Sequence, residues 1–456
     1  MQVKERNTWE VLRDHLAQDD STGLNEYLSA LSGEETLRAL MRLELEEQQQ
    51  ILARLTPESA ADVFEFIPDE SAGDLLGELN PRVAASIVSE MSSDEQADVL
   101  SELDADDLEE ILRHMDDEDV IEARQLMAYD EDVAGGLMMK EYFSFPQMYR
   151  ASSVLRDLAG REEEYELNHV LYIYITGRRG ELLGVARIRD IIVAPPDARL
   201  ADILHPAVSV KDKTKLDELE DFFDENNISA VPVVDDNNRM LGVVRRRAVY
   251  DAVAERADAD HLKSQGIVGG EELRSMPTAI RSRRRLSWLS VNIVLNLIAA
   301  SVIAQFQDVL SAMIILAVFL PIVSDMSGCS GNQAVAVSMR ELSLGVIRTS
   351  DLFYVWRKEV VVGIINGLAL GILISAIAWV WQGNGWLGLV VGSALALNTV
   401  LAVSIGGTVP IVLKALKVDP AVASGPILTT VTDMCGFFLL LGSASLMLPL
   451  LTGIQT

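Results

Sequence analysis

The fold of this chain is decided by the stretch Gly425-Pro426-Ile427-Leu428-Thr429-Thr430-Val431-Thr432-Asp433, which opens the last long apolar segment. That segment continues to about Leu451. About 20 apolar residues are enough to cross a bilayer, so the segment predicts a membrane-spanning helix. Asp433 then lies inside the membrane, roughly two helical turns from the start of the span. A carboxylate at that depth costs about 2.5–3.5 kcal/mol on insertion scales, which favours a polar cavity or a bound cation around it.

Three threonines, Thr429, Thr430 and Thr432, add hydroxyl oxygens next to Asp433. A site made only of oxygen ligands suits a hard cation such as Mg²⁺ or Ca²⁺. The alternative is a carboxylate that only hydrogen-bonds a neighbouring helix. We favour the cation site, because an ionisable residue inside a membrane is by default a functional-site hypothesis.

Four more apolar segments precede this one, so the sequence predicts an α-helical transmembrane domain of five helices over residues 286–456. The earlier spans are residues 286–304, 309–339, 360–381 and 386–413. Polar residues at 324–333 interrupt the second span, and Pro410 kinks the fourth. Irregular backbone at membrane depth must line a cavity or be covered by protein, so these spans and the last can line one path. Because five helices make a thin wall, we expect a homodimer in which a cation separates two Asp433 carboxylates.

The basic residues of this half fall in loops on one side of the membrane. Arg281, Arg283, Arg284 and Arg285 precede span one; Arg340, Arg348, Arg357 and Lys358 lie between spans two and three; Lys414 and Lys417 lie between spans four and five. The two remaining loops hold no Lys or Arg. This bias predicts a multi-pass protein of the cytoplasmic membrane, surrounded by lipid, with its N-terminus inside and its C-terminus outside.

The chain carries a net charge of −30 over 456 residues, and most of its acidic residues lie in the first 280. An acidic half of this kind repels phosphates and attracts cations, so we expect no nucleic-acid partner. Its two cysteines, Cys329 and Cys435, both lie in the apolar half and give no disulfide framework. The sequence holds no nucleophile–base pair and no nucleotide-hydrolysis motif, so we expect no enzyme.

Residues 1–136 repeat apolar positions every twelve residues, from Leu55 and Ile67 to Met115 and Met127. Residue types that cap helices follow several of these positions: Thr56, Asn80, Ser92, Asp104 and Asp116. Each unit predicts a turn, a cap and a two-turn helix, and stacked units predict an all-α superhelical domain. Its acidic outer face has two interpretations. It is either the solvated surface of a protein-binding scaffold, or a surface of mutually repelling carboxylates that bound cations stabilise.

Residues 137–263 contain two copies of an α/β unit. Strand pairs at 171–176 with 182–186, and at 231–235 with 240–244, are flanked by helical stretches. The copies, 137–200 and 201–263, resemble a tandem of cystathionine-β-synthase (CBS) regulatory domains, which sense ligands and are not catalytic. Nucleotide-binding members carry Ser/Thr-x-x-Asp after the last strand, whereas the second copy reads Arg245-Arg246-Arg247-Ala248, which argues against a nucleotide there.

Three motifs resemble those of the MgtE family of magnesium transporters and channels, and the resemblance covers nearly the whole chain. They are Tyr129-Asp130-Glu131-Asp132-Val133-Ala134-Gly135-Gly136-Leu137-Met138, Gly331-Asn332-Gln333 after Pro321, and Val418-Asp419-Pro420-Ala421 followed by Pro426 and Thr432-Asp433. The resemblance implies a homodimeric Mg²⁺ pathway and a connecting helix over 264–285 that plugs or releases it. It also implies a hydrated Mg²⁺ at Asp433, with Thr429, Thr432, Gly328, Gly331 and Asn332 around it.

Three positions depart from the family pattern near this path: Ser327, Cys329 and Gly425. They leave Asp433 in place but bear on which ion passes. Cys329 is a soft ligand type, which raises the alternative of Mn²⁺, Co²⁺ or another divalent ion, against the plainer interpretation of a buried structural cysteine.

In the family, cytoplasmic Mg²⁺ bridges carboxylates of the N-domain and the CBS pair and closes the pore. The matching acids here are Asp62, Asp94, Asp98, Asp217, Asp251 and Asp260, whereas Asn227, Ala248, Arg256 and Ala259 replace other acids. Positive charge stands nearby at Arg245, Arg246 and Arg247. We expect these arginines and Arg256 to pair with N-domain carboxylates in place of some of the Mg²⁺. Closure would then respond less steeply to Mg²⁺, because a fixed cation cannot report a concentration.

The sequence therefore predicts a multi-domain membrane protein that acts as a homodimeric Mg²⁺ channel gated by its N and CBS domains. One alternative is a pathway for another divalent cation. The other is a membrane-anchored divalent-cation sensor that signals through its soluble half. Ion flux in reconstituted vesicles separates the sensor from both transport hypotheses, since Asp433→Ala should derange flux only if the protein transports.

Overall fold

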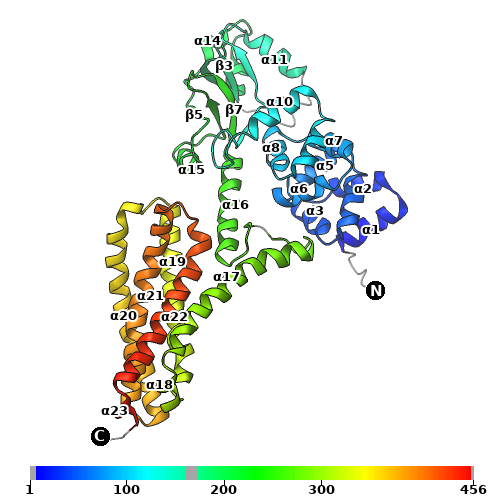
Figure 1. The fold of residues 1–456 in the computed structure, drawn as a ribbon. Helices are drawn as coiled ribbons and strands as arrows, with labels where there is room; N and C mark the ends of the chain where they lie inside the picture. The colour runs from blue at the N-terminus through cyan, green and yellow to red at the C-terminus, as the bar shows by residue number, and fades with distance from the viewer. Residues whose placement is uncertain (1–6, 161–171, 271, 453–456) are drawn as a thin grey trace, which may run out of the picture. The chain divides into compact units, whose positions relative to one another are not determined.

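The computed structural model describes residues 7–160, 172–270 and 272–452. The chain divides into two compact units, residues 1–256 with 273–276, and residues 257–272 with 277–456. Figure 1 labels the elements of both: short helices and two small sheets belong to the first unit, and long apolar helices belong to the second.

The N-terminal part consists of short helices, most of two to three turns. They are α1 (Thr8–Gln18), α2 (Ser21–Ser29), α3 (Gly33–Leu40), α4 (Leu45–Leu52), α5 (Pro57–Phe64), α6 (Asp69–Gly77), α7 (Pro81–Val88), α8 (Ser93–Ser101), α9 (Ala105–Leu112) and α10 (Asp117–Leu126). From α3 onward each helix packs against the helix two places further along, as in α5 with α7 and α6 with α8. This stacking confirms the predicted superhelix, in which no single helix could bury its apolar face alone.

The predicted helix starts are confirmed as well. Thr56, Asn80, Ser92, Asp104 and Asp116 are the N-cap residues of α5, α7, α8, α9 and α10. Ser92 forms the capping box with Glu95, whose carboxylate accepts a hydrogen bond from the Ser92 amide at 3.3 Å. Repeat positions such as Ile67 and Met91 are buried in the shared core of this part.

The α/β part contains two sheets of three and four strands. Its elements are β1 (Met138–Met139), β2 (Ser144–Pro146), α11 (Ala151–Ala159), β3 (Tyr172–Thr176), β4 (Leu182–Arg187), α13 (Ile188–Val193), α14 (Leu200–Ile203), β5 (Val210–Lys211), α15 (Leu216–Glu225), β6 (Ala230–Val234), β7 (Met240–Arg245) and α16 (Arg246–Ser264). The strand orders are β2-β3-β4 and β1-β7-β6-β5. The pairs β3–β4 and β6–β7 are antiparallel, as the two predicted repeats require. β1 lies in the first predicted copy, residues 137–200, yet pairs with β7 of the second.

The second unit is a bundle of long helices. They are α17 (Thr278–Ala304), α18 (Gln307–Ala312), α19 (Leu316–Ser343), the 3₁₀ turn η1 (Thr349–Asp351), α20 (Leu352–Gln382), α21 (Gly385–Ala415), α22 (Pro420–Leu446) and α23 (Leu448–Thr452). Within the described residues, four of them are long and apolar enough to cross a membrane: α17, α20 with its leading turn, α21, and α22 from Ser424. The second predicted span, α19, packs against α21 and α22 in the same bundle, although its polar residues make it less apolar than those four helices.

Two local predictions about this unit are wrong. The polar stretch 324–333 does not break the second span, because α19 is helical from Leu316 to Ser343. Serine and threonine hydroxyls in helices satisfy backbone carbonyls of the preceding turn, and Ser327 does so to the Val323 carbonyl at 2.8 Å, so polar composition alone did not require a break. The predicted connecting helix over 264–285 is also not continuous: residues 265–270 and 272–277 are not helical, and α17 begins at Thr278.

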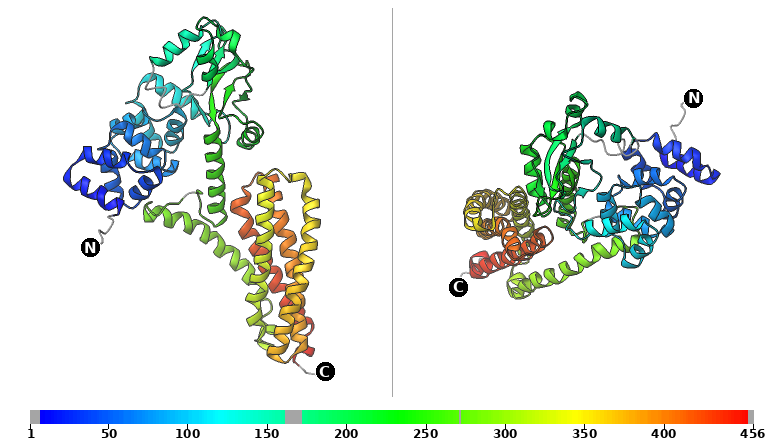
Figure 2. Two further views of the ribbon diagram at one scale, coloured as in Figure 1. Left: turned by 180° about the vertical axis from the view of Figure 1, so that it is seen from behind. Right: turned by 90° about the horizontal axis from the view of Figure 1, so that it is seen from above.

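Helices α20 and α21 run side by side in both views of Figure 2, in yellow and orange. Glycines set their close approach: a Cβ built on Gly371 would lie 2.6 Å from the Gly392 carbonyl oxygen, and one on Gly392 would lie 2.5 Å from that of Gly371. Small residues at helix contacts let membrane helices pack backbone to backbone.

Candidate functional site

Asp433 lies on α22 within a candidate span, and its side chain is half-buried. The Ser324 hydroxyl of α19 donates a hydrogen bond to its Oδ1. Among the described residues, no basic side chain forms an ion pair with this carboxylate. A membrane acid whose partner is a neutral hydroxyl retains a charge that a cation can neutralise.

Asn398 of α21 ties three helices together next to this acid. Its side-chain amide is fully buried and donates to the Thr432 carbonyl at 3.1 Å and to the Val323 carbonyl at 3.5 Å. Neither Asn398 nor Ser324 was predicted from the sequence as part of the site. An asparagine in the middle of an apolar run was the available signal, since such a side chain needs partners from another helix.

The two threonines of the predicted ion site donate their protons to their own helix. Thr432 Oγ1 donates to the Thr429 carbonyl at 3.0 Å, and Thr429 Oγ1 donates to the Gly425 carbonyl at 3.1 Å. Each oxygen keeps acceptor capacity for a cation or its water. Thr429 is half-buried, whereas Thr432 is 1% exposed within the single chain.

The predicted residues of α19 divide between two sides of that helix. Gly328 faces α22, since a Cβ built there would lie 4.0 Å from Thr432 Oγ1. Gly331 packs on α21 instead, because a Cβ on Gly406 would lie 2.2 Å from the Gly331 carbonyl oxygen. Asn332 is exposed, and with Asp325 and Cys329 it forms an exposed polar face at helical spacing. The expected burial of Cys329 is therefore wrong for the single chain.

In the first unit, Asp94 of α8 is buried and paired with an arginine. Its Oδ2 lies 3.0 Å from Arg245 Nη2, and its side chain is 8% exposed. Its Oδ1 is buried without a hydrogen-bond partner in the described part of the chain. The helical part and the α/β part are therefore joined by the ion pair of Asp94 and Arg245. The second carboxylate oxygen of Asp94 can still accept a hydrogen bond.

The other three arginines differ in what they contact. Arg247 lies 3.1 Å from Glu65 of the helical part and 3.3 Å from Asp251 on its own helix. Arg256 pairs with Asp217, inside the α/β part. Arg246 donates to the backbone carbonyls of Ile228 and Asn226, and its guanidinium lies over the Phe223 ring. The predicted pairing with N-domain carboxylates is therefore wrong for Arg246 and Arg256.

Asp98 and Asp69 belong to a second group of acids, and within the described residues neither of these two carboxylates forms an ion pair with an arginine. Burial raises the pKa of Asp98 to about 9 and that of Asp69 to about 7, and the nearby Glu131 and Glu255 add to both shifts. Burial also raises the pKa of Asp62, with Glu58 and Glu65 contributing. Asp260 lies in the other unit, so the predicted sensing acids fall into separate places. Asp69 was missed, because its acidic neighbours come from distant parts of the chain.

Glu141 and Ser93 form a further link between the helical and α/β parts that the sequence did not reveal. The Glu141 carboxylate accepts from the Ser93 amide at 3.0 Å and from its hydroxyl at 2.9 Å. The Ser93 hydroxyl in turn accepts from the Lys140 amide at 2.7 Å. This network fixes α8, which carries Asp94, against the strand region around β1.

Comparison with known proteins assigns all three parts of the chain. Family models described as the MgtE intracellular N domain, the CBS domain and the divalent cation transporter MgtE match residues 31–132, 200–255 and 320–443. The chain is 33% identical over 322 residues to the magnesium transporter MgtE of Bacillus subtilis, which covers 70% of each chain. It is also 33% identical over 331 residues to the magnesium transporter MgtE of Thermus thermophilus, at 72% of each.

A solved structure of the cytosolic domain of the Mg²⁺ channel MgtE in complex with ATP is similar to the soluble part. It is 30% identical, covers 53% of this chain and 98% of that one, and has a TM-score of 0.50. The soluble part of a magnesium transporter matches at 26% identity and the same TM-score, covering 55% of this chain and 98% of that one. With these matches and an apolar helical bundle, the chain belongs to the MgtE family of magnesium transporters.

Proposed function

We propose that the protein conducts Mg²⁺ across the cytoplasmic membrane as a homodimer, with Asp433 holding the hydrated ion. The observation that carries this proposal is a half-buried carboxylate at membrane depth whose partner is the neutral Ser324 hydroxyl. Mg²⁺ keeps most of its waters and needs few protein carboxylates, so one acid from each of two copies suits it.

The exposed polar face of α19 supports the second copy. Asp325, Cys329 and Asn332 are exposed in the single chain at membrane depth, where contact with lipid is costly. A two-fold axis near this face would cover it and bring two Asp433 side chains toward one path. The threonine oxygens and Gly328 would then border the ion, whereas Gly331 would hold α19 on α21.

The basic loops support an orientation with the soluble half in the cytoplasm. Arg281 and Arg285 at the start of α17 pair with Glu272 of the connector, on the same side as Lys414 and Lys417 at the α21–α22 loop. The α20–α21 turn at the other end, Gly383–Asn384, carries no basic residue.

Gating would pass through the buried pair of Asp94 and Arg245. An arginine held at this carboxylate supplies part of the charge that Mg²⁺ would supply, so docking of the helical part would depend weakly on the ion. The second contact, Arg247 with Glu65, acts in the same sense but is largely exposed and adds about 0–1 kcal/mol. Limited proteolysis across a Mg²⁺ titration tests this: strong protection with a steep midpoint in the unmodified protein contradicts it.

Flux from reconstituted vesicles tests the transport proposal itself. Added Mn²⁺ or Co²⁺ should inhibit Mg²⁺ uptake only weakly. The Asp433→Asn substitution should reduce Mg²⁺ uptake to background. Asp308→Asn, an exposed acid at the start of α18, is the matched control and should leave uptake unchanged. Uptake of Mn²⁺ or Co²⁺ in preference to Mg²⁺ would favour the softer-ion alternative and the exposed Cys329, and undiminished flux in Asp433→Asn would refute the site.

A further inference from the structure

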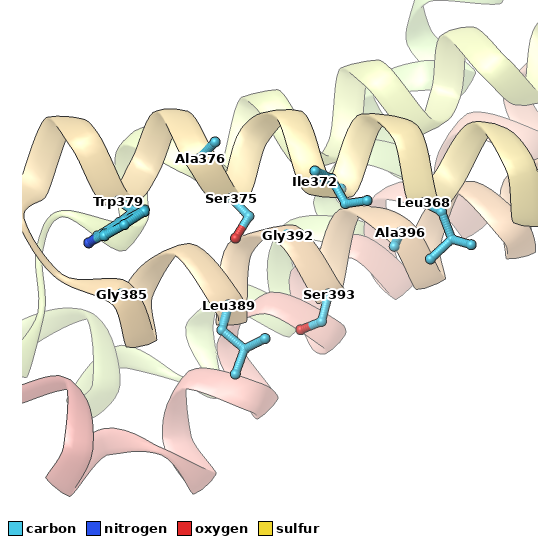
Figure 3. A pocket seen from close by; sticks show the side chains of 11 residues that line it. Leu368, Ile372, Ser375, Ala376, Trp379, Gly385, Leu389, Gly392, Ser393 and Ala396 are labelled. Atoms are coloured by element: carbon cyan, nitrogen blue, oxygen red, sulfur yellow. The ribbon is translucent and has the colours of Figure 1, made fainter.

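Helices α20 and α21 border a groove of about 510 Å³ on the side of the bundle that carries no acid (Figure 3). Leu368, Ile372, Ser375 and Trp379 line it from α20, and Leu389 and Ser393 line it from α21. Its volume falls within the roughly 300–1,000 Å³ typical of small-molecule sites. Both helices are candidate membrane spans, so the groove opens toward hydrocarbon.

The groove is continuous with the lipid-facing surface of these helices. Leu368, Ile372 and Leu389 are each about half exposed or more in the single chain. Further apolar side chains on α20, such as Ile365 and Leu373, extend the same exposed surface beyond the groove. In a membrane this surface meets acyl chains, so hydrocarbon already surrounds the opening.

The groove is short enough to lie within one leaflet. From Leu368 to Trp379 the lining covers eleven residue steps of α20, or about 16 Å at 1.5 Å per residue. One leaflet measures about 20 Å when its interfacial layer is included, so the lining covers the interface and the upper part of the hydrocarbon. Trp379, close to the end of α20 at Gln382, fits the membrane interface, where tryptophan side chains are enriched. The groove thus runs from the interface at the α20–α21 turn toward the bilayer centre.

One polar group in the groove lacks a protein partner. Ser393 Oγ donates to the Val390 carbonyl at 3.2 Å, and Ser404 Oγ donates to the Val400 carbonyl at 2.6 Å, as is usual in membrane helices. The Ser375 hydroxyl has no hydrogen bond within the described residues, and Figure 3 shows it directed toward α21 at the base of the groove. It lies about 10 Å below the end of α20, near the level of lipid ester groups.

A second copy of the chain fits this groove poorly. The surfaces that need cover are the exposed polar face of α19 and the half-buried Asp433 of α22, and both helices pack on α21 beside α20. The groove offers no charge and no exposed acid to a partner helix. A two-fold axis that serves Asp433 therefore leaves the exposed side of α20 toward lipid.

We propose that this groove binds one acyl chain of a phospholipid from the leaflet at the α20–α21 turn, with the Ser375 hydroxyl donating a hydrogen bond to its ester carbonyl. Below the ester the chain fills the apolar part of the groove from Ser375 past Leu368, and the headgroup lies at the turn. Such a bound lipid bridges α20 to α21 where glycines, rather than interlocking side chains, form the contact. It is independent of the ion pathway, so either proposal can fail alone.

Native mass spectrometry of the full-length protein, exchanged into detergent with palmitoyl-oleoyl phosphatidylglycerol, tests the site. We expect one retained lipid per protomer in the unmodified protein. Ser393→Phe, which fills the groove from an exposed position, should reduce retention about tenfold. Leu397→Phe, an exposed position one turn further along α21, is the matched control and should retain the lipid. Ser375→Ala should weaken retention without changing the fold.

Three results would overturn the proposal. Equal retention in Ser393→Phe and Leu397→Phe would show only annular lipid. Loss of lipid in both variants would show that the bound lipid lies elsewhere on α21. Conversion of a dimer to a monomer by Ser393→Phe, with Leu397→Phe still dimeric, would assign the groove to a contact between copies.

Discussion

Asp94 in the soluble unit and Asp433 in the membrane unit are both acids shielded from water, yet they have different partners. Asp94 lies 3.0 Å from a guanidinium, and Asp433 accepts from a serine hydroxyl. A carboxylate with a fixed cation is neutralised within the fold, and breaking such a pair leaves a costly buried charge. A carboxylate with a neutral partner still lacks a counter-charge. We infer that the first acid is mainly structural and the second is available to a mobile ion.

Among the substitutions that test this comparison, removal of the Arg245 guanidinium should have the largest effect on stability. Arg245→Ala leaves the Asp94 charge buried and should destabilise docking of the helical part by about 1–3 kcal/mol, since the arginine is partly exposed. Mg²⁺ should restore much of this loss, because the ion can then occupy the vacated position. Hydrogen exchange of the α8 amides, with and without Mg²⁺, measures both effects.

Arg256→Ala is the control for that experiment, because its partner Asp217 is exposed and belongs to the α/β part alone. It should change α8 exchange little. If the α8 amides of Arg245→Ala exchange as in the unmodified protein, the pair of Asp94 and Arg245 does not stabilise docking. The proposed difference between Asp94 and Asp433 would then be contradicted.

The buried acids Asp69 and Asp98 predict a pH dependence of stability with the opposite sign to that of a carboxylate in a salt bridge. Their pKa values rise from 3.8 in the unfolded chain to about 7 for Asp69 and about 9 for Asp98, so the folded state holds protons that the unfolded state releases. The stability that protonated Asp69 and Asp98 contribute is therefore fully present below about pH 4, and it is lost as the pH rises toward 9. Urea unfolding of the soluble part across this range measures the slope.

Asp98→Asn should remove most of that slope and stabilise the soluble part at pH 8 by about 1–2 kcal/mol, because the folded state no longer has to take up a proton at this position. The exposed Asp106→Asn on α9 should do neither. A slope that persists in Asp98→Asn would place the titrating group elsewhere, and a slope of the opposite sign would contradict the burial of these acids.

Asn398 provides the smallest test, within the membrane unit. Asn398→Leu removes the amide that joins Thr432 and Val323 and should cost about 0.6–1.7 kcal/mol, the range of interhelical hydrogen bonds in membranes. Thermal unfolding in detergent reports the loss. Leu395→Ile, at a neighbouring buried position, controls for packing alone, and an equal loss there would deny the hydrogen bonds any role.

Much of the fold followed from local sequence rules. The twelve-residue repeat predicted the helices α5 to α10, and the strand pairs predicted β3–β4 and β6–β7, because these signals act within a few residues. The strands β1, β2 and β5 were not predicted. Hydropathy found the spans, but polar composition misplaced a break in α19, since Ser327 satisfies a carbonyl of its own helix.

The site was less accessible from sequence. The position of Asp433 needed only hydropathy, whereas its partner Ser324 lies 109 residues earlier in the chain. The pairing of Asp94 with Arg245 spans 151 residues and depends on how the helical and α/β parts meet. Single-sequence patterns carry no information on contacts at such separations, so Asp69 and Asn398 went unnoticed.

The contrast between the two acids is tested most directly by counting tightly bound Mn²⁺, as a spectroscopic substitute for Mg²⁺, with electron paramagnetic resonance on the full-length protein. Asp433→Asn should lose one ion per dimer, whereas Asp94→Asn should lose none, because Arg245 already neutralises that acid. Undiminished binding in Asp433→Asn, or a loss confined to Asp94→Asn, would contradict the account.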